Sequence, residues 1–197
     1  MVIFSDEQLK LAAKMGEEGS ARALTILSKR NVGVKTRNVK VVPYAQAMEV
    51  FSKVKEQSVV AYTQAMTGIN GISVLSLERA EALRLVDLFN GRPNNTTKVM
   101  QELDRSTIRE TLNILANSYA TALVNNNDVA PIMLGSPSMI TRMHLVAMAE
   151  KIEANAQDGE RAVIFETALS VEDTDFKINL YFFFLAKNKE ESGKANK

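Results

Sequence analysis

The order of helix and strand patterns, nearly the same in both halves of the chain, is the feature that most limits the fold. The first half is predicted to form a helix over 6–29, a strand over 34–43 that Pro43 ends, a short helix over 44–54, strands over 58–66 and 71–77, and a helix over 77–91. The second half is predicted to form helices over 103–124 and 136–156 and strands over 160–170 and 175–186. Residues 91–98, GRPNNTTK, are the best candidate for a linker between the halves.

The two halves also share a few identical residues. VAYTQAM (60–66) aligns with VIFETAL (163–169), and ALTILS (23–28) aligns with YATALV (119–124). Chance can produce so few identities, but the letters and the common order of elements together favour an internal duplication.

A duplication of this kind predicts an α+β fold. Two helix and β-hairpin units, about 6–91 and 99–186, would share one mainly antiparallel sheet about a pseudo-twofold axis. We expect a single domain over 1–190 and a disordered tail over 187–197, because the tail is charged and contains glycine.

The composition excludes several classes of function. The chain has no cysteine, which excludes disulfides. Its formal net charge of +1 argues against a nucleic-acid-binding protein. His144 is the only histidine, so a histidine-based metal cluster cannot form, and a packing or surface role on a helix is expected. The longest apolar stretch, 178–186, is too short to cross a bilayer, and the N-terminus lacks a secretory signal pattern. We expect a cytoplasmic protein that does not insert into membranes.

The helix predicted over 103–124 has two distinct faces. At about 100° per residue, one stripe contains the apolar residues Ile108, Leu112, Leu115, Tyr119 and Ala122. Roughly opposite this stripe lie the polar residues Ser106, Glu110, Asn113 and Asn117. The first set is expected to be buried and the second set to face outward.

Three explanations of the polar face are open. TIRE (107–110) fits a capping box with Thr107 as the N-cap and Glu110 reaching back to its amide. Any solvated helix face also carries such residues. Alternatively, the amide of Asn113 could hold a water in line with a phosphoryl group, because an amide donates and accepts at once. Such a site would act on the surface of another protein.

The letters of this helix resemble a known family. The pattern SxxxExxN in STIRETLN (106–113), followed by LGSPSM with Pro137, is similar to the signature of the CheC/CheX/FliY chemotaxis phosphatases. SKRNVGVKTRNVKVVP, RLVDLFNG and the segment from ERAVIFETALS to YFFFL also look like CheC, so the resemblance covers most of 6–186. Pro137 lies one position beyond the usual family spacing.

The resemblance implies a specific activity. Family members hydrolyse the aspartyl-phosphate of the response regulator CheY. By position, Glu110 would dock to a lysine of the regulator, Asn113 would orient the hydrolytic water, and Ser106 would be an auxiliary polar contact. The Mg²⁺ belongs to the regulator, so the chain would need neither a cofactor nor a metal ligand of its own. CheD is a further partner that the resemblance suggests.

The first helix departs from this pattern. CheC proteins often carry the motif in both halves, but the corresponding residues here are Lys10, Lys14 and Glu17. We expect the first-half equivalents, Lys14 and Glu17, to be inactive, which leaves one active site in the second half. Two alternatives remain: a non-catalytic binding module of the chemotaxis or flagellar system, either a CheD partner or a FliM-like switch component, and an unrelated domain with a chance motif.

Overall fold

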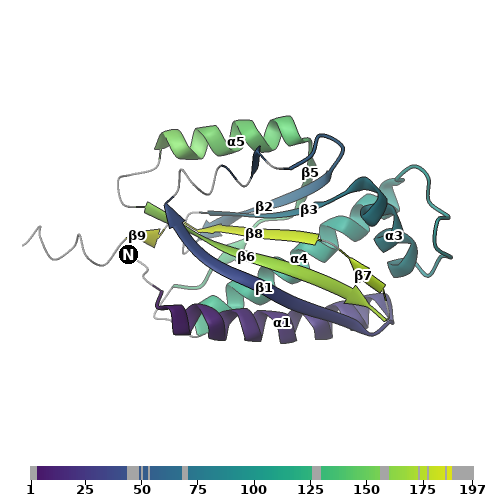
Figure 1. The fold of residues 1–197 in the computed structure, drawn as a ribbon, viewed down its shortest axis with the longest axis horizontal. Coiled ribbons are helices and arrows are strands. Elements are labelled where there is room, and N and C mark those ends of the chain that lie inside the picture. The colour runs from purple at the N-terminus through teal and green to yellow at the C-terminus, as the bar shows by residue number, and fades with distance from the viewer. Residues whose placement is uncertain are drawn as a thin grey trace, which may run out of the picture.

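In the part of the chain that it describes, the computed structural model of the protein places four helices, two of them long, around a central layer of strands (Figure 1). The structure describes residues 4–43, 49, 51, 52, 54–67, 71–125, 130–155, 160–172, 174–176, 178–184, 186 and 187. The first half contains α1 (Asp6–Ser28), β1 (Val32–Pro43), β2 (Val59–Thr67), β3 (Gly71–Leu77) and α3 (Arg79–Phe89). The second half contains α4 (Glu102–Asn125), β4 (Met133–Leu134), β5 (Ser138–Ile140), α5 (Arg142–Asn155), β6 (Glu160–Val171), β7 (Thr174–Phe176), β8 (Ile178–Phe184) and β9 (Ala186–Lys187).

The strands confirm the predicted α+β class and its antiparallel pairing. The single sheet that we expected is divided into two hydrogen-bonded sheets. One has the order β1-β6-β7, with β9 also on β6, and the other has the order β4-β2-β3-β8, with β5 also on β2. The division falls in the last predicted strand, because its two ends pair with β6 while its middle, β8, pairs with β3.

The strand pairing relates the two halves to each other. β1 of the first half pairs with β6 of the second, and β5 of the second half pairs with β2 of the first. Between them, β3 pairs with β8, one strand from each half. Two related units that exchange their strand partners across a common axis would produce this arrangement.

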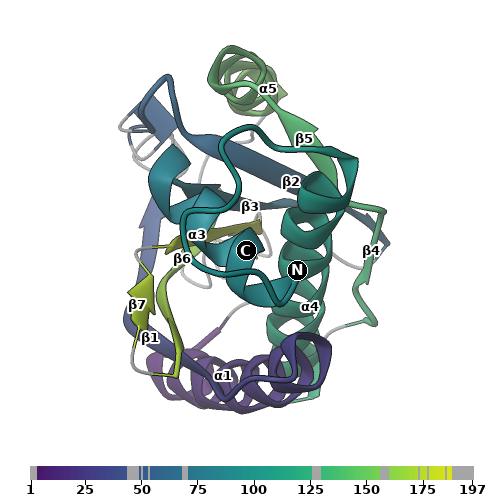
Figure 2. The ribbon, with the colours of Figure 1, turned by 90° about the vertical axis from the view of Figure 1, so that its right-hand side faces the viewer.

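Helices cover both sides of the strands. Figure 2 shows α5 on one side, with α1, α3 and α4 on the other. The larger core lies on the second side, where alternate strand residues such as Leu75, Phe165 and Phe182 pack against the three helices. Their strand neighbours Val74, Ile164 and Tyr181 face the smaller core beside α5. This alternation explains why the strands are strongly apolar and not half polar.

The helix predicted over 136–156 begins too early. Residues 138–140 form the strand β5, which pairs with 60–62 of β2, and α5 begins only at Arg142. The apolar residues Met139 and Ile140 fit a short strand as well as a helix, and only the neighbouring strand decides between the two. The short helix predicted over 44–54 falls mainly outside the described residues, as do the turn at 68–70 and the tail after 187.

The helix α1 is continuous through both of its glycines. Ser5 and Gln8 form a capping box at its start, with Ser5 accepting from the Gln8 amide at 3.2 Å. Gly16 lies directly against the ring of Tyr119, so that a Cβ at this position would come within 2.7 Å of the ring. The glycine therefore allows α1 and α4 to pack closely.

Among the residues that the structure describes, no helix is long and apolar enough to cross a membrane. In the same part of the chain, the histidine and acidic side chains form no group of three or more that could hold a metal ion.

Candidate functional site on the outer face of α4

The predicted division of α4 into two faces is confirmed. Ile108, Leu112, Leu115, Tyr119 and Ala122 are all buried. Glu110 and Asn117 are exposed, and Ser106 and Asn113 are partly exposed. The polar residues are therefore accessible to another molecule.

The predicted capping box at Thr107 is wrong. α4 already begins at Glu102, so Thr107 lies inside the helix, where its hydroxyl donates to the Leu103 carbonyl at 3.0 Å and to Asn90 Oδ1 at 2.9 Å. Glu110 is thus not used to cap the helix. Its carboxylate is available on the outer face.

A buried aspartate fixes the start of α4. Asp104 accepts from the Gln101 amide at 2.9 Å, from Arg92 Nη2 at 2.7 Å and from Asn90 Nδ2 at 3.1 Å. Burial favours the neutral acid, but the donors from Gln101, Arg92 and Asn90 outweigh it and hold the pKa of Asp104 below its usual value of 3.8. Asp104 is not among the predicted site residues, because its only signal in the sequence is an acid in the first turn of a helix.

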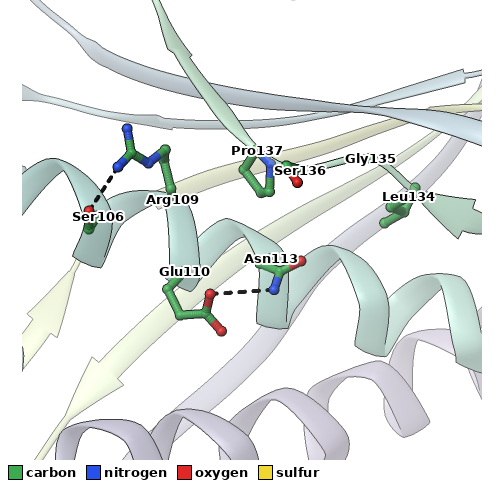
Figure 3. Close-up of a pocket in the computed structure, with 8 residues that line it drawn as sticks. All are labelled: Ser106, Arg109, Glu110, Asn113, Leu134, Gly135, Ser136 and Pro137. Atoms are coloured by element: carbon green, nitrogen blue, oxygen red, sulfur yellow. Dashed lines mark hydrogen bonds between the residues drawn. The ribbon is translucent and has the colours of Figure 1, made fainter.

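A groove lies beside the polar face of α4 (Figure 3). Its volume is about 380 Å³, and we refer to it as the α4 groove. α4 contributes Ser106, Arg109, Glu110 and Asn113, and the segment before β5 contributes 134–137. The structure therefore brings Pro137, the last residue of the sequence motif, into one groove with the three polar residues of its first part.

Hydrogen bonds to β2 hold the second wall of the groove. The Gly135 amide donates to the Gln64 carbonyl at 2.9 Å, and Thr63 Oγ1 donates to the Gly135 carbonyl at 2.5 Å. Pro137 follows and leads into β5. A proline fits this position because its fixed φ suits the approach to an edge strand and it has no amide to satisfy.

The polar side chains of α4 form a connected row. Asn113 Nδ2 donates to Glu110 Oε2 at 3.4 Å, and Asn117 Nδ2 donates to Asn113 Oδ1 at 2.8 Å. Asn117 Nδ2 also lies 2.8 Å from the Asn113 carbonyl. Both ends of the Asn113 amide are therefore engaged, the oxygen more closely than the nitrogen.

Arg109 also lines the groove, although it is not among the predicted site residues. Its Nη2 donates to Ser106 Oγ at 2.8 Å and to Glu102 Oε1 at 2.6 Å. Figure 3 shows its side chain directed toward Ser106 and away from Asn113. Helical spacing alone could have found it, since residues three positions apart lie on neighbouring parts of one face.

The first-half equivalents lie in a separate groove. Lys10, Lys14 and Glu17 line a space of about 570 Å³ between α1 and β1. Glu17 Oε1 accepts from the Thr36 amide at 2.6 Å, so its carboxylate is committed to the strand. His144 lies in neither groove. It is exposed near the start of α5, with Nδ1 2.9 Å from Thr141 Oγ1.

Comparison with known proteins gives the same fold in several solved structures, while no protein-family model matches the chain. FliY of Thermotoga maritima matches with a TM-score of 0.57 and 17% identity, over 98% of this chain and 96% of that one. FliM in a FliG–FliM complex from H. pylori matches at 0.59 and 11%, over 92% and 94%. CheX in a CheX–CheY–BeF3–Mg²⁺ complex from Borrelia burgdorferi matches at 0.52 and 16%, over 93% and 99%.

These similarities extend over nearly the whole of each chain. At identities of 11–17% they establish the fold, which is the one that the sequence resemblance to CheC/CheX/FliY proteins predicted. The expectation that CheC is the nearest member stays a prediction.

Proposed function

We propose that this protein is a chemotaxis phosphatase that hydrolyses the aspartyl-phosphate of a CheY-type response regulator, with one active site in the α4 groove. The observation that carries the proposal is the meeting of Ser106, Glu110, Asn113 and Pro137 in one open groove, on a fold also found in a CheX that is bound to CheY. Such a substrate would place the activity in the cytoplasm.

Glu110 is proposed to dock the regulator. Its carboxylate is exposed, and its hydrogen bond to Asn113 Nδ2 is long, at 3.4 Å. A regulator lysine that pairs with Glu110 would therefore displace little. The pairing would leave Asn113 Nδ2 available to a water molecule at the phosphoryl group.

Asn113 is proposed to orient the water that attacks. The water oxygen bonds to phosphorus, the bond between phosphorus and the aspartyl oxygen breaks, and the proton of the water passes to the phosphate. The products are inorganic phosphate and the free carboxylate of the regulator. Mg²⁺ held by the regulator would stabilise the charge on the phosphoryl group, so no metal ligand is required of this chain. Ser106, which accepts from Arg109, would be an auxiliary contact.

The test is the rate at which a phosphorylated CheY-type regulator loses phosphate in the presence of each variant. Asn113→Ala is expected to lower kcat on the order of 100-fold, because orientation of the water provides most of the catalysis. Glu110→Ala is expected to act mainly on KM, because its role is docking. Asn125→Ala, an exposed change at the end of the same helix, is the matched control and should match wild type. Equal rates for Asn113→Ala and wild type would refute the proposal.

A binding role without catalysis is the second candidate. A FliM that forms a complex with FliG has the same fold, and a FliM-like switch component or a CheD partner would need no active asparagine. Pull-down of CheD or of switch proteins, together with a regulator dephosphorylation rate that the protein does not change, would favour this role. Repeating the phosphatase assay with CheD added separates an inactive protein from one that CheD stimulates.

A further inference from the structure

The groove between α1 and β1 corresponds to the α4 groove residue by residue on its helical wall. Lys10, Ala13, Lys14 and Glu17 of α1 line it with the same spacing as Ser106, Arg109, Glu110 and Asn113 of α4. Both grooves are open, and the one on α1 is larger, about 570 against 380 Å³. The chain therefore keeps a groove at the equivalent place on its first helix but lines it with different side chains.

The change is a gain of positive charge, because one cation and one carboxylate, Arg109 and Glu110, line the α4 groove. Four cations line the α1 groove, Lys10, Lys14, Lys35 and Arg37, against two carboxylates, Glu17 and Glu18. All four cations are exposed, and among the described residues no carboxylate lies within ion-pair distance of any of them. Glu17 is bound to the Thr36 amide. We refer to this lining as the basic groove.

The strand wall of the basic groove is irregular and firmly held. The register of β1 against β6 shifts between Thr36 and Asn38, so Arg37 has no partner on β6. A bulge of this kind interrupts the alternation of side chains and redirects them, which explains why consecutive residues 35–39 all line the groove. Thr36 Oγ1 lies 2.6 Å from the hydroxyl of the buried Tyr119 and fixes the bulge to α4.

We propose that the basic groove docks an acidic segment of a protein partner. Lys14 stands where α4 has Glu110, so a basic side chain that Glu110 could bind would be repelled here and a carboxylate would be attracted. A small anion such as phosphate suits the groove less, since all four cations are exposed and water competes for them. An acidic segment along the groove would meet cations from both α1 and β1 at once.

Titration of the full chain with a fluorescent deca-glutamate peptide tests the proposal, with a deca-glutamine peptide and inorganic phosphate as comparison ligands. Binding is followed by anisotropy, and the site is located by NMR shifts of the backbone amides. Lys14→Glu is expected to weaken deca-glutamate binding roughly three- to tenfold, because an attraction becomes a repulsion. Lys98→Glu makes the same change in charge on the exposed loop after α3 and should bind as wild type does.

The position of the NMR shifts and the response of the Lys98→Glu control distinguish the possible outcomes. Shifts in α1 and β1 that Lys14→Glu reduces and Lys98→Glu leaves unchanged would support an acidic-segment site. Equal weakening by both variants, shifts elsewhere, or displacement of the peptide by phosphate at the same concentration would overturn it. Asn113→Ala should bind the peptide normally, so failure of the phosphatase proposal and failure of this one are separate results.

Discussion

At the scale of single residues, the orientation of the Asn113 amide depends on its neighbour Asn117. The oxygen of the amide accepts a short hydrogen bond of 2.8 Å from Asn117 Nδ2, while its nitrogen donates over 3.4 Å to Glu110. The oxygen is thus fixed and the nitrogen is the end that a water or a partner can take. Asn117, one turn further along α4, therefore sets the direction in which Asn113 points its amide nitrogen.

Under the proposed function, Asn117→Ala should therefore lower kcat for regulator dephosphorylation by about tenfold and leave KM nearly unchanged. Without its partner the Asn113 amide can rotate, and a misoriented donor loses part of the positioning effect. Steady-state kinetics of the variant beside Asn125→Ala measure the two constants separately. A rise in KM with an unchanged kcat would instead assign Asn117 to docking.

At the scale of elements, the close packing of α1 on α4 depends on one glycine. Gly16 is buried against the ring of Tyr119, whereas Gly19, one turn further along, would bring a Cβ only to 3.5 Å from Ser118. Tyr119 in turn packs against Phe165 and Phe182 with ring centroids 5.1 Å away in both cases. A shift of its ring would disturb the centre of the larger core.

The two glycines should respond in opposite directions to alanine. Gly16→Ala is expected to destabilise the protein by about 1–3 kcal/mol, because the methyl group forces apart two tightly packed helices. Gly19→Ala is expected to stabilise it by up to about 1 kcal/mol, because alanine is the better helix former and its Cβ would make only ordinary van der Waals contact with Ser118. Urea unfolding followed by circular dichroism measures both changes, and a loss of stability in Gly19→Ala would contradict the packing argument.

At the scale of the whole molecule, two buried aspartates organise the junction between the halves. Asp87 of α3 accepts from the amides of Thr96 and Thr97 at 2.8 and 3.1 Å, and Asp104 of α4 binds Arg92 and Asn90. The segment predicted as a linker is therefore a structured loop that these carboxylates fix. It determines where α4, and with it the α4 groove, begins.

The junction should make the protein sensitive to acid. The pKa of Asp104 is lower in the folded protein than its usual value of 3.8. The contribution of its carboxylate to the free energy of unfolding is therefore complete above about pH 4, and it is lost as the pH falls through the pKa of the folded state. Asp104→Asn should be less stable than wild type at neutral pH by about 2–3 kcal/mol, because Arg92 loses a charged partner. The difference should shrink in acid. Urea unfolding between pH 7 and pH 3, with the exposed Asp175→Asn as control, measures it.

The sequence alone determined α1, α3 and α4 and most of the strands. The 3.6-residue period identified α1 and α4 to within two residues at each end, and it separated the buried stripe of α4 from Ser106, Glu110, Asn113 and Asn117 correctly. These features are local, because a helix forms its hydrogen bonds within itself and the spacing of its apolar residues can be recognised in the sequence. The spacing of Ser106, Glu110 and Asn113 in the motif likewise put these three residues on one accessible face of the helix.

The tertiary structure alone decided what depends on partners distant in the sequence. β5 is a strand and not the start of a helix because β2 pairs with it. The one expected sheet is two because β8 pairs with β3 while β7 and β9 pair with β6. Pro137 joins Glu110 and Asn113 in a groove because β2 holds the segment before it. Such contacts cannot be recognised from a local sequence pattern, because they depend on which strand edges lie side by side in the folded protein.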